Sequence, residues 1–192
     1  RHNLNRQVNN LKIFEFGKIY SIDQEAYLET QKLTIFTCGL FKGQSWKDNS
    51  IHADFFLMKG VLIKIFNQFG INSSHFSTKE FKCQYSETAI VLSYQDACIA
   101  EVGKFSHETL NRIAIKKEVF YVDVNVDLLF NIQKKIKLEY TQIPRFPSIK
   151  RDLSLLVSKD VSYSNIQQVI KKRKTHFLKR ISLFDVYVGK GI

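Results

Sequence analysis

Residues Asp54–Gly70, DFFLMKGVLIKIFNQFG, contain the clearest helical pattern in the chain. Asp54 precedes the apolar residues and can cap a helix, and Gly70 follows them as a stop signal. Six apolar residues recur at helical spacing: Phe55, Met58, Leu62, Ile65, Phe66 and Phe69. The stretch therefore predicts a helix that buries one face. Because the sequence around it is strand-like, the fold is expected to combine this helix with β-strands.

Runs rich in β-branched and aromatic residues surround this helix and predict strands. They cover Leu11–Tyr20, Lys32–Leu40, Thr88–Tyr94, Cys98–Gly103 and Glu118–Val126. A shorter helix is expected after Ser106, whose hydroxyl can cap it. Several strands and few helices, without strict alternation, predict an α+β domain with a mainly antiparallel sheet and flanking helices.

A domain boundary is expected near residue 141, which divides the chain into residues 1–140 and 141–192. The two prolines of the chain, Pro144 and Pro147, lie just beyond it. The charge also changes there. Residues 141–192 carry 11 Lys and Arg against three Asp, a net charge of +8, whereas residues 1–140 carry a net charge of +3.

The second segment has a β-α-β pattern. Arg151–Val157 alternates apolar and polar residues and predicts a strand, and Arg180–Val188 predicts another. Between them, Ser162 or Ser164 can cap a helix that turns Ile166, Val169 and Ile170 inward. Two strands and one helix leave an apolar face uncovered, so this unit is expected to need more chain.

The basic excess of the second segment has two interpretations, and both remain open. A basic surface attracts polyanions, and Phe146, Tyr163, Phe177 and Tyr187 could stack on unpaired RNA bases. Alternatively, the charges form a solvated face and the rings pack a small core. Cations at the end of a helix also complement its dipole.

No motif for catalysis or metal binding is found in the sequence. Gly189–Ile192 lacks the first glycine, the hydroxyl and the helix of a phosphate-binding loop, and Ser45 is expected to be a turn residue. Cysteines and histidines are scattered, which argues against a metal site. No apolar run is long enough to cross a membrane, so a cytoplasmic location is expected. The chain opens at Arg1 without methionine, which we interpret as a piece of a longer polypeptide.

Four segments, in order, resemble the beta subunit family of bacterial phenylalanyl-tRNA synthetases. They are LKIFEFGKIY from Leu11, SWKDNSIHADFFLMKG from Ser45, VGKFSHETLNRIAIKKEVFYVDV from Val102, and IPRFPSIKRDLSLLV from Ile143 followed at a distance by LFDVYVGKGI. The resemblance covers essentially the whole chain. It implies that residues 1–140 form a catalytic-like domain on a class II synthetase antiparallel sheet.

The resemblance also implies a role without catalysis. In this family the active site belongs to the alpha subunit, and class II catalysis uses arginines to bind ATP. No arginine occurs between Gly17 and Leu110. We therefore expect no catalytic residue, no metal site and no cofactor bound by this chain alone. For the whole enzyme the family implies ATP and magnesium, an alpha2beta2 assembly, and ligation of phenylalanine to tRNA(Phe).

For residues 141–192 the resemblance implies the first half of a ferredoxin-fold anticodon-binding domain, an incomplete βαβ unit. The charge pattern adds candidate RNA-binding residues: Arg145, Lys150, Arg151, Lys171, Lys172, Arg173 and Lys174. The family pattern supports Arg151 directly, although this side chain could instead pair with the neighbouring Asp152. The alternative function is a free-standing RNA-binding or ligand-binding regulatory module with a ferredoxin-like tail.

Overall fold

The computed structural model describes residues 2–23, 26–72, 76–136, 142–143, 145–173 and 177–187. The chain forms two compact units, Arg1–Thr141 and Gln142–Ile192. No described helix combines the length and the apolar character that a membrane span requires.

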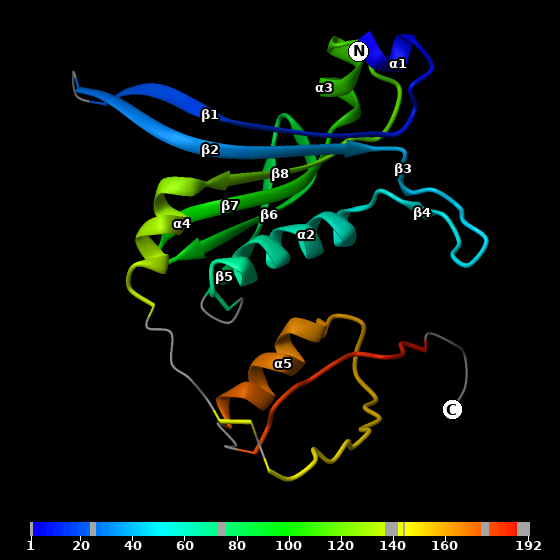
Figure 1. Ribbon diagram of the computed structural model, residues 1–192, viewed down its shortest axis with the longest axis vertical. Coiled ribbons are helices and arrows are strands. Elements are labelled where there is room, and N and C mark those ends of the chain that lie inside the picture. Colours follow the sequence, from blue (N-terminus) through cyan, green and yellow to red (C-terminus); the bar gives the residue numbers. More distant parts are fainter. Residues whose placement is uncertain are drawn as a thin grey trace. The chain divides into compact units, whose positions relative to one another are not determined.

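The first unit is built on a six-stranded antiparallel sheet with the strand order β1-β2-β8-β7-β6-β5. Its strands are β1 (Leu11–Asp23), β2 (Ala26–Cys38), β5 (Ser77–Cys83), β6 (Ser86–Tyr94), β7 (Ala97–Phe105) and β8 (Phe120–Asn125). β1 and β2 pair along their whole length, but β2 pairs with β8 only from Lys32 to Thr37. The outer part of the β1–β2 hairpin therefore extends beyond the sheet as a two-stranded ribbon (Figure 1).

Two helices, α2 (Phe55–Gln68) and α4 (Val126–Gln133), cover one face of this sheet. Their buried side chains meet Val102 of β7 and Val122 and Val124 of β8 in one core. Two shorter helices, α1 (His2–Asn5) and α3 (His107–Arg112), lie near each other away from α2 (Figure 1). A second sheet contains β3 (Leu40–Lys42) and β4 (Ile51–His52).

The predicted helix and its two ends are confirmed in α2. The Asp54 carboxylate accepts the backbone N–H of Leu57 at 2.7 Å. Gly70 has a φ of +71°, which lets the N–H of Ile71 return to the carbonyl of Phe66 at 3.0 Å. Met58, Leu62 and Phe66 are fully buried, so the helical spacing identified the correct face. The cap at Ser106 is also confirmed, because its hydroxyl accepts the N–H of Thr109 at 3.3 Å.

The end of the predicted strand at Val126 is wrong, and helix α4 was not foreseen. β8 ends at Asn125, whose side-chain oxygen accepts the N–H of Leu128 at 3.1 Å and starts the helix. Val126 is therefore the first residue of α4. The alternating strand pattern and the spacing of Val126, Leu129 and Ile132 overlap at this residue, and the cap determines which pattern applies.

In the second unit the predicted helix is confirmed, and neither predicted strand is found among the described residues, which do not include Val188. α5 (Tyr163–Lys172) begins after Ser162, whose hydroxyl accepts the N–H of Asn165 at 3.3 Å. Among the described residues, Arg151–Val157 and 180–187 form no β-ladder. Alternation predicts which side chains share a face, but a strand also needs a partner backbone, and neither segment has one here. Val169, predicted to point inward, is exposed, and no described residue of this unit is fully buried.

Candidate functional site

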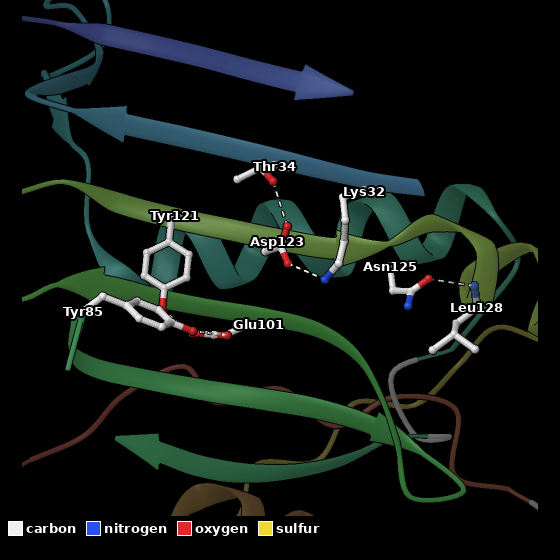
Figure 2. Close-up of polar contacts among 8 residues, drawn as sticks. All are labelled: Lys32, Thr34, Tyr85, Glu101, Tyr121, Asp123, Asn125 and Leu128. Carbon is white, nitrogen blue, oxygen red and sulfur yellow. Dashed lines mark hydrogen bonds and ion pairs between the residues drawn. The ribbon is translucent and has the colours of Figure 1, made fainter. Parts of the chain in front are cut away.

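The face of the six-stranded sheet opposite α2 and α4 carries a row of polar side chains. Thr34 of β2, Asp123 of β8 and Glu101 of β7 are register neighbours across three adjacent strands. Lys32 and Tyr121 lie on the same face (Figure 2). These residues lie on different strands, and the pairing of the strands in the sheet brings them together on one face.

Asp123 is held by both of its oxygens. Its Oδ2 accepts Lys32 Nζ at 2.6 Å, and its Oδ1 accepts the hydroxyl of Thr34 at 2.7 Å. Lys32 and Asp123 are both partly buried, and each side chain neutralises the charge of the other. This group ties β2 to β8.

Glu101 is held by two phenols (Figure 2). Tyr121 Oη donates to its Oε1, and Tyr85 Oη lies 3.0 Å from its Oε2. Gly103, the register partner of Tyr121, leaves room for this contact because a Cβ there would lie 2.8 Å from Tyr121 Oη. Burial, and next the hydrogen bond to Glu101, raise the pKa of Tyr121 well above its ordinary value. Burial is also the largest cause of the raised pKa of Tyr85, followed by contact with Cys83.

The chemistry of this face is that of a closed hydrogen-bonded network. Both carboxylates are already engaged, and both phenols keep their protons at neutral pH. Arginine, which binds phosphate through a planar fork of donors, is absent from Gly17 to Leu110, a range that includes β2, β5, β6 and β7. The face therefore has the character of a scaffold.

The buried phenol of Tyr121 predicts a loss of stability at alkaline pH. Its raised pKa means that the folded state keeps a proton that the unfolded chain releases above about pH 10. Stability is fully present below that pH and falls above it. Relative to Tyr121→Phe, the wild type should lose about 1 kcal/mol more between about pH 8 and pH 11. Urea unfolding at both pH values measures this difference.

The exposed Tyr187 provides the control, since Tyr187→Phe should behave as the wild type. Equal losses in all three proteins would contradict the assignment.

A second candidate surface is an apolar stripe along the hairpin. It consists of Phe14, Phe16, Tyr20 and Ile22 of β1 with Tyr27 of β2, the register partner of Ile22, and is called the β1 stripe. Phe14 and Phe16 are 75% and 57% exposed, although their register partners Ile35 and Leu33 pack against the core. The main contacts of α2 are with β7 and β8 and those of α4 are with β2, so the helix layer lies mainly over the central strands and leaves Phe14 and Phe16 of the edge strand mostly exposed.

The predicted RNA-binding residues lie on the surface of the second unit. Arg145, Lys150, Arg151, Lys171, Lys172 and Arg173 are all exposed, and Lys174 lies outside the described residues. Lys171 and Lys172 form the last turn of α5. No ion pair joins any of these six to a described carboxylate, so the alternative pairing of Arg151 with Asp152 is not formed. Phe146, Phe177 and Tyr187 are exposed beside them in the sequence, and Tyr163 is half-buried.

Sequence reasoning identified the strand that carries the β1 stripe but did not locate an exposed apolar surface on it. The signal was present: Leu11, Ile13, Phe14 and Phe16 place apolar residues on both faces of one strand. A strand with that pattern needs cover on both sides. The Glu101 network was also missed, because its members are paired only by the sheet register.

The fold is that of a class II aminoacyl-tRNA synthetase domain. The chain superimposes on the pyrrolysyl-tRNA synthetase of Desulfitobacterium hafniense with a TM-score of 0.50 at 14% sequence identity, covering 70% of this chain and 47% of that one. This likeness concerns the arrangement of the sheet and helices.

Sequence similarity then assigns the family. Residues 1–126 match the phenylalanyl tRNA synthetase beta chain CLM domain, and residues 144–192 match the ferredoxin-fold anticodon binding domain. The chain belongs to the phenylalanyl-tRNA synthetase beta chain family. It is 30% identical to the phenylalanine–tRNA ligase beta subunit of Porphyromonas gingivalis and 29% identical to that of Bacteroides fragilis, in both cases over 100% of this chain. The chain spans 24% of the length of these relatives.

Proposed function

We propose that this chain works in the cytoplasm as part of the beta subunit of phenylalanine–tRNA ligase, which joins phenylalanine to tRNA(Phe) at the expense of ATP. Residues 1–140 dock the alpha subunit, residues 141–192 bind the anticodon region of the tRNA, and catalysis belongs to the alpha subunit. The whole enzyme uses ATP and magnesium in an alpha2beta2 assembly. The main support for this proposal is the exposed β1 stripe, which lies on a chain that belongs to a beta-subunit family.

The β1 stripe supports docking of another protein layer. An apolar sheet face is stable when another layer covers it, and α2 and α4 leave β1 uncovered. Five large exposed side chains present apolar area on the order of 500 Å², at the upper end of what monomers expose. Lys18 and Glu29 lie on the same face and form an ion pair, so the two charges beside the stripe neutralise each other. A largely neutral apolar face suits a protein partner.

The polar face of the six-stranded sheet, opposite α2 and α4, supports a non-catalytic role. The carboxylates of Asp123 and Glu101 are occupied by Lys32, Thr34 and two tyrosines, and none of the six strands contains an arginine. Binding of the triphosphate of ATP needs several cationic or metal-bound contacts. The one lysine of the network, Lys32, is neutralised by Asp123.

The second unit supports tRNA binding through charge and exposed rings. Six exposed cations without described ion-pair partners can neutralise phosphates, and Phe146, Phe177 and Tyr187 are exposed aromatic side chains. Rings and cations together are the composition of a surface for single-stranded RNA, such as an anticodon loop.

The test is assembly with the alpha subunit. The purified chain should bind the alpha subunit in a calorimetric titration, and the chain alone should show no phenylalanine-dependent ATP–pyrophosphate exchange. The control is the alpha subunit titrated into an unrelated domain of similar basic charge, which should give no heat of binding. Robust exchange by the pure chain would refute the non-catalytic role, and absence of binding would refute the docking role.

A further inference from the structure

The two-stranded sheet of β3 and β4, with the loop between them, forms an arm, residues 40–52, that stands apart from the main sheet (Figure 1). Its loop carries Trp46, the only tryptophan of the chain, with 96% of its surface exposed. A docked aromatic side chain of this size buries about 150–250 Å². In the isolated chain, Trp46 gains none of that stabilisation.

The loop holds Trp46 in a defined turn. The hydroxyl of Ser45 accepts the N–H of Asp48 at 3.0 Å, and the N–H of Ser45 donates to the carbonyl of Asp48 at 2.9 Å. The Asp48 carboxylate pairs with Lys42 Nζ at 2.5 Å across the base of the loop. A side chain presented on a preorganised turn loses less conformational entropy when it docks. The exposure of Trp46 is therefore built into the turn.

The base of the arm is fastened to the strand that carries the β1 stripe. Lys12 Nζ donates to the carbonyl of Phe41 at 2.7 Å and lies 4.8 Å from the centre of its ring. Asn10 Oδ1 accepts the N–H of Leu40 at 2.8 Å. Gly39 permits this close approach, because it has a φ of +74° and a Cβ there would lie 2.4 Å from the carbonyl of Asn9. Lys12 shares a face of β1 with Phe14 and Phe16, so the arm begins where the stripe begins.

The charge of the arm favours a protein over a nucleic acid. Lys42 is neutralised by Asp48, which leaves Lys47 as the one lysine of the loop without a described ion pair. A nucleic-acid surface needs several cations for phosphates, whereas buried tryptophans are enriched at the centres of protein interfaces. We propose that Trp46 is an anchor residue that inserts into an apolar pocket of the same alpha subunit that covers the β1 stripe. This inference rests on the proposed function.

Because Trp46 is the only tryptophan, it can report its own binding. The chain labelled with 5-fluorotryptophan should give one ¹⁹F resonance, which shifts and loses its solvent isotope effect when unlabelled alpha subunit is added. Trp46→Ala should raise the Kd for the alpha subunit about ten-fold or more. Phe81→Ala is the matched control, since Phe81 is an exposed aromatic on β5 at the opposite edge of the sheet, and it should change the Kd less than about two-fold.

The possible outcomes separate this inference from the proposed function. If the alpha subunit binds but the resonance stays in place and Trp46→Ala binds as the wild type does, the anchor role is overturned and docking stands. If the resonance responds to tRNA and not to the alpha subunit, the arm contacts RNA and the inference is equally overturned. If the wild-type chain does not bind the alpha subunit, the proposed function fails and the anchor role fails with it.

Discussion

Replacing Phe14 and Phe16 together with aspartate should weaken binding of the alpha subunit about a hundred-fold or more. Both side chains lie on the β1 stripe and are mostly exposed in the chain alone, so the substitution removes little internal packing. In the complex the same positions would be desolvated, and an unpaired carboxylate there has no compensating partner. The loss therefore comes from removed apolar contact and from two buried charges. Calorimetric titration with the alpha subunit measures it.

The matched control lies on the same strand. Ile19 is 52% exposed and points to the opposite face of β1, because its position alternates with those of Phe16 and Tyr20. Ile19→Asp introduces one negative charge into the same strand, where the double variant introduces two, and should change the Kd only a few-fold. Thermal unfolding of each variant verifies that the hairpin remains folded. Equal losses from both faces would mean that the substitution disrupts the strand, and a wild-type Kd for the double variant would exclude the stripe as the interface.

Replacing Lys171, Lys172 and Arg173 with glutamine should weaken tRNA binding by roughly ten-fold to a hundred-fold near physiological salt. Each cation that contacts a phosphate releases about one counterion, so the slope of log K against log salt should fall by up to about three units. All three residues are exposed at the end of α5. Glutamine keeps the helix propensity, and the lost dipole interaction costs only about 0.3–1 kcal/mol per lysine. Filter binding of tRNA(Phe) at several salt concentrations provides the measurement.

The control for net charge uses exposed lysines of the first unit. Substituting Lys64, Lys116 and Lys134 with glutamine removes the same three charges from a chain of net charge +11. If Lys171, Lys172 and Arg173 contact the RNA directly, this control should retain nearly the wild-type affinity and the wild-type slope of log K against log salt. Equal losses in the two triple variants would show that binding follows total charge, and the assignment of the RNA surface to α5 would be wrong.

Local sequence was sufficient wherever a structural element depends on its own residues. Asp54 and Gly70 define the ends of α2, and Ser106 and Ser162 start α3 and α5, because caps act on backbone groups only a few residues away. The strand-rich composition also predicted the mainly antiparallel sheet, and the order of the motifs indicated the family, whose resemblance implied the class II character.

The sequence was insufficient wherever a structural element depends on a partner. Alternation in Arg151–Val157 predicts two faces but supplies no neighbouring backbone, and the described residues contain no ladder there. The same limit applies to the placement of polar groups. Glu101 and Asp123 became neighbours through the register of β7 and β8, which no local pattern encodes.

Phe14 and Phe66 illustrate the division most directly. Both are phenylalanines in apolar runs with clear periodicity, and the sequence correctly predicts one in a strand and the other in a helix. Phe66 is fully buried because α2 lies on the central strands, whereas Phe14 is 75% exposed because the helix layer ends before the edge of the sheet. Secondary structure follows from hydrogen bonds and rotamers within a segment, but burial follows from what the rest of the chain places on top of it. The exposed edge that makes this chain a candidate docking partner therefore arises from its tertiary structure.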